Sequence, residues 1–281
     1  MPIIAMTQEM ATLGKDVALG LCEALRLKQV RHEIGDVVAG RLHVKKSLIR
    51  RIREGKASAI EKWSADEKTI SIFTAEEVYD LAVSGDVLIR GWGATQLLRQ
   101  VAHVPCIRVC APLELRIERL MQRLDTDDAE LARREILSDD AARAARIAEH
   151  FGVIWGDPVL YDLTLNTERL PVADCVDMVV NLMRGKAFQE TPQSRQCLAN
   201  LALRARVRAA LRASPATVGI DVSIEADAGK IIVSGIVIND RERELCVEGI
   251  LGTAGVREVE NRLKTMTGGM RQFPSGHHPI E

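Results

Sequence analysis

The first two thirds of the chain alternate short apolar runs with amphipathic stretches. Apolar runs at 2–6, 86–89 and 104–110 have the length and composition of buried strands, and a further strand is predicted at 161–166. Between them, apolar residues spaced three and four apart predict helices at 15–27, 75–82, 112–124, 127–151 and 172–183, while the basic stretch 41–62 predicts helices and loops. Strands that alternate with helices predict an α/β fold with a parallel sheet flanked by helices.

The pattern changes after residue 184. Residues 185–195 are polar, contain Pro192 and have no period, so they predict a linker. The predicted elements beyond it are a helix at 198–213, strands at 219–225 and 230–238, a helix to about 253 and a strand at 256–263. The expected domains are therefore 1–184, a linker at 185–196, a small α+β domain at 197–266 and a disordered tail at 267–281.

Composition and charge narrow the classes of function. The 281 residues carry a formal net charge of −1, which argues against broad attraction to nucleic acid or to an anionic membrane. No apolar run approaches a membrane span and no secretory signal pattern is present, so a cytoplasmic protein is expected. The six cysteines are scattered without a C-x-x-C pair, which favours buried thiols over metal ligands.

Gly14-Lys15-Asp16, where the first predicted strand gives way to a helix, looks like the end of a phosphate-binding loop. Such a loop, G-x-x-x-x-G-K-[ST], wraps phosphates with backbone N–H groups and supplies a lysine for charge and a hydroxyl for Mg²⁺. Here Glu9 stands at the first glycine position and Asp16 at the hydroxyl position. Two carboxylates are thus expected where phosphate oxygens and a metal-bound hydroxyl normally lie.

Arginines downstream could supply the positive charge that phosphoryl transfer requires. Arg116, Arg119 and Arg123 share one face of a predicted helix, and Arg143 and Arg146 lie three apart in another. The alternative is that these arginines pair with neighbouring carboxylates on solvated helices. A second basic run at 45–51 is explained equally well by an exposed helix face.

Four segments together resemble the cytidylate kinase-like family of nucleoside-monophosphate kinases. They span roughly residues 3 to 183 and comprise the loop at 7–17; the run Val87 to Ala94, similar to the family's V-I-V-G-R-G-A; Ala111-Pro112-Leu113 with Arg116 to Arg119; and Trp155-Gly156-Asp157-Pro158 with Tyr161-Asp162-Leu163 and Asn166-Thr167. The resemblance implies a P-loop α/β fold that uses ATP and Mg²⁺ to phosphorylate a nucleoside monophosphate such as CMP.

The resemblance also implies roles for individual residues. Lys15 would hold the β- and γ-phosphates, while Arg143 and Arg146 would close over the transition state, with Asp140 matching the family's D-x-x-R spacing. The implied nucleotide-binding residues are Thr12, Gly14, Lys15, Asp16, Arg116, Arg119 and Asp157.

The sequence also departs from the family's pattern. Ala11, Thr12 and Leu13 replace residues that are mostly glycine and serine, so side chains are expected to hinder the approach to phosphate. Trp92 replaces the arginine of G-R-G-A, and either Arg90 substitutes for it or Trp92 fills a structural gap.

Residues after the predicted linker resemble the BON domain. The match rests on Val207, Ala210-Leu211, Val222, Ile224, the run Gly229 to Val237, Gly255-Val256, Val259, Asn261 and Leu263. It implies a small αββαβ sandwich that contacts an unknown ligand, lipid or protein and carries no catalytic residues. BON domains are often found in exported envelope proteins, so a cytoplasmic copy is a departure.

Two hypotheses follow from the sequence. In the first, the chain is a phosphotransferase of the cytidylate kinase type, with ATP and a CMP-like nucleotide as its ligands. In the second, it is a catalytically inactive kinase fold that binds a nucleotide or a partner and signals through the BON domain. The carboxylates Glu9 and Asp16 in the loop motivate the second hypothesis.

Overall fold

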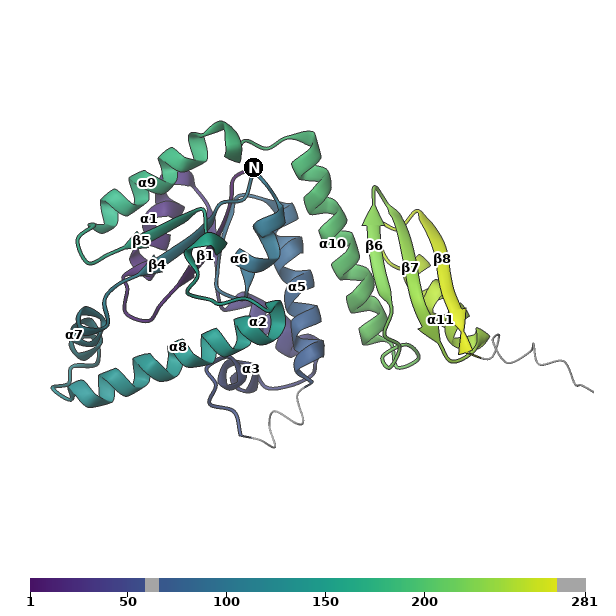
Figure 1. The fold of residues 1–281 in the computed structure, drawn as a ribbon, viewed down its shortest axis with the longest axis horizontal. Coiled ribbons are helices and arrows are strands. Elements are labelled where there is room, and N and C mark those ends of the chain that lie inside the picture. Colours follow the sequence, from purple (N-terminus) through teal and green to yellow (C-terminus); the bar gives the residue numbers. More distant parts are fainter. Residues whose placement is uncertain (59–65, 267–281) are drawn as a thin grey trace, which may run out of the picture. The chain divides into compact units, whose positions relative to one another are not determined.

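The computed structural model describes residues 1–58 and 66–266, without the side chain of Arg53 (Figure 1). The described residues form two compact units that divide between Leu198 and Ala199. Residues 59–65 of the predicted basic stretch and the predicted tail at 267–281 lie outside the described part of the chain. No helix among the described residues is long and apolar enough to cross a membrane.

Five parallel strands form the sheet of the first unit, in the order β2-β3-β1-β4-β5. Their bounds are β1 (Ile3–Gln8), β2 (Lys28–Val30), β3 (Val87–Arg90), β4 (Cys106–Cys110) and β5 (Leu163–Asn166). The central strand β1 pairs with β3 from Ile3 beside Val87, and with β4 from Ala5 beside Cys106. The predicted parallel sheet is confirmed.

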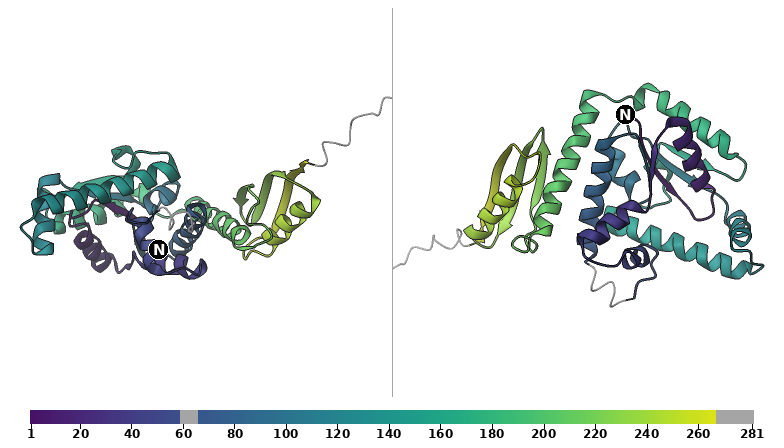
Figure 2. Two further views of the ribbon diagram at one scale, coloured as in Figure 1. Left: turned by 90° about the horizontal axis from the view of Figure 1, so that it is seen from below. Right: turned by 180° about the vertical axis from the view of Figure 1, so that it is seen from behind.

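Helices cover both faces of this sheet. Helices α1 (Gly14–Leu25) and α9 (Val172–Arg184) lie side by side on one face (Figure 2). Their buried Leu21 and Val179 pack with Ile107 of β4. On the other side of the sheet, α5 (Glu67–Ser84) contacts β3 and α6 (Ala94–Leu97) contacts β1 and β4. The remaining elements of the unit are α2 (Glu33–Arg41), α3 (Lys46–Arg53), η1 (Leu98–Gln100), α7 (Leu113–Leu124), α8 (Ala129–Phe151), η2 (Pro158–Leu160) and η3 (Lys186–Phe188).

Two elements of the first unit differ from the sequence prediction. Strand β2 was not predicted, because its three residues Lys-Gln-Val are too short and too polar to form an apolar run. Helix α5 begins at Glu67, earlier than the predicted residue 75. The reason is a cap, since the carboxylate of Asp66 accepts hydrogen bonds from the Lys68 N–H at 3.1 Å and the Thr69 hydroxyl at 2.6 Å.

The second unit has the predicted order of helix, strand, strand, helix and strand. Its elements are α10 (Pro192–Ala213), β6 (Ser223–Asp227), β7 (Lys230–Val237), α11 (Asp240–Leu251) and β8 (Glu258–Thr265), and α10 begins before the division between the units. Strand β7 pairs antiparallel with β6 and parallel with β8, and a turn at Ala228 and Gly229 joins β6 to β7. Apolar residues of both helices and all three strands form its core, among them Val207, Ile231, Val233 and Ile250.

The predicted linker is partly helical. Residues 186–188 form η3, and α10 already begins at Pro192, six residues before the predicted helix. Thr191 and Ser194 cap this helix reciprocally: the Ser194 N–H donates to the Thr191 hydroxyl at 3.1 Å, and the Thr191 N–H donates to the Ser194 hydroxyl at 2.9 Å. Pro192 therefore starts a helix, because a proline costs little in the first turn.

His103 gives the first unit a pH-dependent stability. The side chain is 4% exposed, Nδ1 lies 2.8 Å from the Ser194 hydroxyl, and Nε2 has no hydrogen-bond partner among the described residues. Burial lowers the pKa of His103 below its ordinary value. The unfolded chain then binds a proton more readily than the folded chain, so stability should fall as the pH drops below about 6.5.

We therefore expect His103→Gln to reduce the pH dependence of the free energy of unfolding between about pH 7.5 and 5.5. Urea unfolding at several pH values measures this slope. The exposed His150→Gln variant is the control and should keep the wild-type slope. An unchanged slope in His103→Gln would contradict the assignment, whatever the variant's absolute stability.

Candidate functional site

The loop between β1 and α1 has the backbone of a phosphate cradle. Ala11 and Leu13 have φ values of 60° and 58°, in the left-handed region that few residues other than glycine adopt. Where residues with left-handed and right-handed backbones alternate, their successive N–H groups form a concave site that binds anions. Within the described ranges, the N–H groups of residues 10–15 have no hydrogen-bond acceptor. The loop therefore adopts left-handed conformations at Ala11 and Leu13, although residues 9–13 contain no glycine.

The residues of the loop differ in how far they are buried. Thr12 is fully buried, and its hydroxyl donates to the Glu9 carbonyl oxygen at 2.9 Å. At Gly14 a Cβ would lie 2.6 Å from the Gln8 side-chain oxygen, so glycine is required while Gln8 lies there. Lys15 and Asp16 are exposed in the first turn of α1, where helix N–H groups and a positive end attract anions. The hindrance expected from Ala11, Thr12 and Leu13 stays a prediction.

Glu9 does not face open space. Its Oε1 lies 2.5 Å from Nη2 of Arg108, and its Oε2 lies 3.4 Å from Nη1 of Arg116. Arg108 on β4 also donates to the Trp155 carbonyl at 2.9 Å, and its guanidinium lies 4.6 Å from the Trp155 ring centroid. The carboxylate expected among phosphate oxygens is therefore neutralised by two buried arginines.

Arg116 and Arg119 bind the protein around the loop. Arg116 on α7 donates from Nε to the Met10 carbonyl at 2.8 Å, and both of its terminal nitrogens bind Asp140 on α8 at 2.8 and 2.9 Å. Arg119 donates to the hydroxyl and carbonyl of Thr167, and the Thr167 hydroxyl donates to the Thr12 carbonyl at 2.9 Å. Both predicted nucleotide ligands lie at the loop, but Arg116 is fully engaged in holding it.

Asp157 lies apart from this group. Its carboxylate caps η2 by accepting a hydrogen bond from the Val159 N–H at 3.0 Å. No hydrogen bond or ion pair within the described residues joins Asp157 to the loop. Its predicted role in nucleotide binding thus gains no support from a contact.

Two arginines converge on Gln8, at the end of β1. Arg90 at the end of β3 donates to the Gln8 side-chain oxygen at 3.1 Å, and Arg143 on α8 donates to its carbonyl oxygen at 3.2 Å. Arg143 also pairs with Asp139 at 2.7 Å. Arg90 is 5% exposed, and its Nε has no partner among the described residues.

These arginines repel one another. Burial, followed by the nearby Arg31 and Arg143, lowers the pKa of Arg90 to about 10. Burial and Arg143 likewise lower the pKa of Arg146 to about 10, although Asp139 and Glu67 oppose the shift. Arg90 and Arg146 remain cations at neutral pH. An anion placed among the arginines would offset the cost of burying their charge and would weaken their mutual repulsion.

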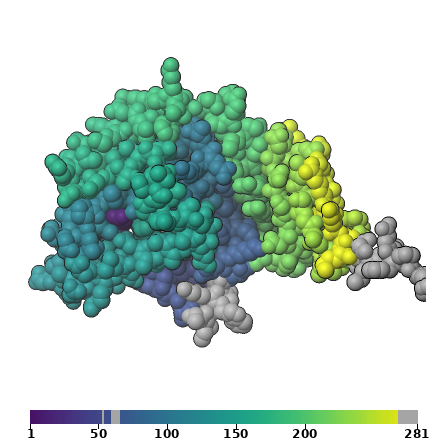
Figure 3. Space-filling view, viewed as in Figure 1, coloured from purple at the N-terminus to yellow at the C-terminus, as the bar shows by residue number. Residues whose placement is uncertain are grey.

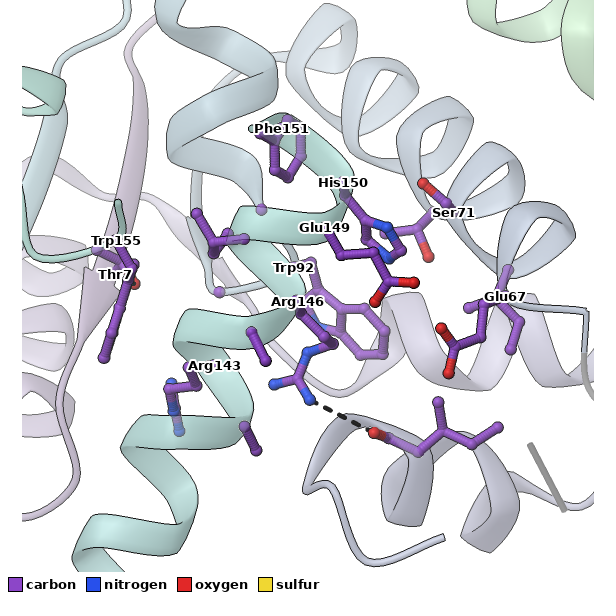
Figure 4. A pocket seen from close by; sticks show the side chains of 18 of the residues that line it. Thr7, Glu67, Ser71, Trp92, Arg143, Arg146, Glu149, His150, Phe151 and Trp155 are labelled. Atoms are coloured by element: carbon purple, nitrogen blue, oxygen red, sulfur yellow. Dashed lines mark hydrogen bonds between the residues drawn. The ribbon is translucent and has the colours of Figure 1, made fainter. Parts of the chain in front are cut away.

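A cavity of about 230 Å³ lies beside these arginines (Figure 4). Arg143 and Arg146 line it from α8, and Arg146 donates to the Ile52 carbonyl oxygen at 3.4 Å. Trp92 also lines it, with its indole nitrogen donating to the Arg31 carbonyl and its ring against Gly35. Much of the wall is apolar, as at Ile70. In the space-filling view, purple N-terminal residues show at the bottom of a depression among teal segments (Figure 3).

Sequence reasoning found part of this arrangement. The loop, Arg143 and Arg146 were predicted, and Arg90 was one of two alternatives for the arginine that Trp92 replaces. Arg108 was missed, although a charged residue inside the apolar run of β4 was a usable signal. The described residues contain no group of three or more His, Cys, Asp and Glu side chains that could hold a metal ion.

Comparisons with known families agree with both predicted resemblances. The sequence model of the cytidylate kinase-like family matches residues 3–169, and that of the BON domain matches residues 200–266. Both resemblances stated from the sequence are confirmed.

Individual relatives cover the first unit. The cytidylate kinase of Staphylothermus marinus is 27% identical over 135 residues, which are 47% of this chain and 75% of that protein. The cytidylate kinase of Desulfurococcus amylolyticus is 30% identical over 125 residues, 44% of this chain and 64% of that protein. A crystal structure of an uncharacterized protein from Eubacterium ventriosum has a TM-score of 0.53 and 19% identity, covering 66% of this chain and all of that one. This last similarity concerns the fold alone.

Proposed function

Because the chain belongs to the cytidylate kinase-like family, we propose that it binds ATP at the β1–α1 loop and phosphorylates CMP or a related nucleoside monophosphate. The acceptor would occupy the cavity beside α8. The observation that carries the proposal is the convergence of Arg90 and Arg143 on Gln8, which immediately precedes the loop, because Arg143 also lines the cavity. Phosphates from both substrates would meet at this point.

The loop supplies the binding groups for the ATP phosphates. The N–H groups of residues 10–15 and the positive end of α1 would contact phosphate oxygens, and Lys15 would add a full charge. Mg²⁺ bound with ATP would neutralise charge on the phosphate oxygens. A magnesium ion held between a nucleotide and a protein needs only one or two carboxylates, and the exposed Asp16 beside Lys15 fits that requirement.

The cavity supplies complementary groups for the acceptor. Its arginines suit a phosphate dianion, because guanidinium groups bind phosphate oxygens with charge-assisted hydrogen bonds. Its apolar wall and the indole of Trp92 suit a planar base. During transfer, Arg90 and Arg143 would stabilise the charge that develops between donor and acceptor.

A second candidate function is nucleotide sensing without phosphoryl transfer. The observation that favours it is Asp16, which places a carboxylate where a metal-binding hydroxyl is usual. In that case the chain would bind a nucleotide and pass the bound state to the BON domain. Binding without Mg²⁺ dependence and without turnover distinguishes this function from the kinase.

The test is calorimetric titration of the intact chain with ATP and with CMP, each with and without Mg²⁺. We expect both to bind, and Arg146→Met, which removes an arginine that lines the cavity, to weaken CMP binding by about 10- to 150-fold through loss of charged hydrogen bonds. Arg99→Met is the matched control, because Arg99 is an exposed arginine on η1. If neither nucleotide bound the unaltered chain, the proposed function would be wrong.

A further inference from the structure

Three carbonyl oxygens in and beside the loop are held by side chains of other elements. The Gln8 carbonyl accepts from Arg143, the Met10 carbonyl from Arg116 and the Thr12 carbonyl from Thr167. The N–H groups of residues 10–15, in contrast, have no acceptor in the part of the chain that the structure describes. Side chains of the surrounding elements thus hold the carbonyls and leave the N–H groups available.

Glu9 is at the centre of this scaffold. Its carboxylate contacts Arg108 of β4 and Arg116 of α7, and also accepts from the Ala111 N–H at 3.4 Å. The three side chains are largely buried, with 14% of Glu9, 8% of Arg108 and 5% of Arg116 exposed. Buried charges of this kind persist only when they are paired and hydrogen-bonded. Glu9 is therefore the carboxylate that pairs with Arg108, and it shares Arg116 with Asp140.

From this arrangement we propose that Glu9 is a positioning residue that holds the loop in its phosphate-binding shape. The inference rests on the proposed binding of ATP at this loop. Ala11 and Leu13 have left-handed backbones without being glycine, and such conformations persist only where the surroundings impose them. Arg116 holds the Met10 carbonyl next to Ala11, and Glu9 and Asp140 together hold Arg116.

The scaffold also connects the loop to α8. Arg116 binds Glu9 and the Met10 carbonyl on one side and Asp140 on the other. Asp140 precedes Arg143 by one helical turn, and Arg143 contacts the Gln8 carbonyl. A carboxylate at position 9 thereby helps to place the arginines that would serve the acceptor.

Repulsion by Glu9 and positioning by Glu9 have opposite effects on the affinity for a triphosphate. If Glu9 merely repelled phosphate, Glu9→Gly would bind a triphosphate more tightly, since it removes a negative charge and restores the usual glycine of such loops. If Glu9 positions the loop, the same substitution should bind a triphosphate less tightly. The sign of the change in affinity separates the two roles.

The experiment is titration of the full chain and its Glu9→Gly and Glu9→Gln variants with inorganic tripolyphosphate and with ATP, without Mg²⁺. We expect both probes to bind Glu9→Gly about tenfold or more weakly, and Glu9→Gln to lie between it and the unaltered chain. Glu23→Gln removes an exposed carboxylate of α1 and should leave both affinities unchanged. Unfolding curves establish a temperature at which every variant is folded.

The affinities and the unfolding midpoints of the variants separate the possible roles of Glu9. Equal or tighter binding of tripolyphosphate by folded Glu9→Gly, or by Glu9→Gln if the glycine variant fails to fold, overturns the positioning role alone. A purely structural Glu9 would lower the unfolding midpoint without changing either affinity, which also overturns it. Failure of the unaltered chain to bind tripolyphosphate and ATP overturns both this inference and the proposed function.

Discussion

Replacing Lys15 with alanine is expected to lower the rate of phosphoryl transfer from ATP to CMP by about 10²- to 10³-fold. Lys15 is exposed in the first turn of α1, beside N–H groups that have no acceptor within the described residues. It is the only side-chain cation within residues 9–16 of the sequence, so no neighbour in the loop can replace its charge on the transferred phosphate. A coupled assay of ADP formation measures the loss.

Lys28→Ala is the matched control for this variant. Lys28 is also an exposed lysine, but it begins the edge strand β2, whereas the loop follows the end of the parallel central strand β1. It should keep the wild-type rate and ATP affinity. A Lys15→Ala variant that retained more than half of the wild-type rate would contradict the proposed role of the loop. Unaltered protein that bound both nucleotides without turnover would instead favour the sensor.

Ile107→Ala is expected to have the largest effect on stability, lowering the free energy of unfolding by about 2–5 kcal/mol. Ile107 is fully buried in β4, where it pairs with Met6 of β1 and Leu163 of β5. Its side chain also packs in the core formed with α1 and α9. Truncation leaves a cavity that this closely packed region cannot fill, and urea unfolding measures the cost.

Ile154→Ala provides the matched comparison. The same side chain is 76% exposed at Ile154, so its truncation should change the free energy of unfolding by less than about 0.5 kcal/mol. Similar losses in the two variants would mean that the core around Ile107 is not closely packed.

The pattern of hydrophobic residues along the sequence predicted the elements whose apolar residues are buried. Strands β1, β3 and β4 were found because each is an apolar run in a sheet covered on both faces, and β5 was found although only its leucines are apolar. Strand β2 and the start of α10 were not found, because they depend on pairing and capping. Pro192 illustrates the limit, since its effect depends on whether Thr191 and Ser194 cap a helix around it.

The candidate site was predictable only where a local motif marks it. Gly14 and Lys15 begin the helix at the end of the loop that follows β1, and Arg143 has a characteristic spacing from Asp140. Glu9 was taken as an obstacle to phosphate because its partner Arg108 is 99 residues away in the sequence. Contacts of this kind arise from the sheet order, which brings the ends of β1 and β4 together. The boundaries of the two domains and the roles of the site residues remain predictions.

The central position of β1 has a consequence for the synthesis of the protein. The strand Ile3–Gln8 emerges from the ribosome early, but its partners β3 and β4 begin at Val87 and Cys106. At about 5–20 residues per second, this apolar segment waits unpaired for several seconds or more. In contrast, β6 and β7 are neighbours along the chain and can pair as soon as both have emerged. The nascent chain is therefore most exposed to aggregation, and most dependent on chaperones, before the loop that follows β1 has acquired its shape.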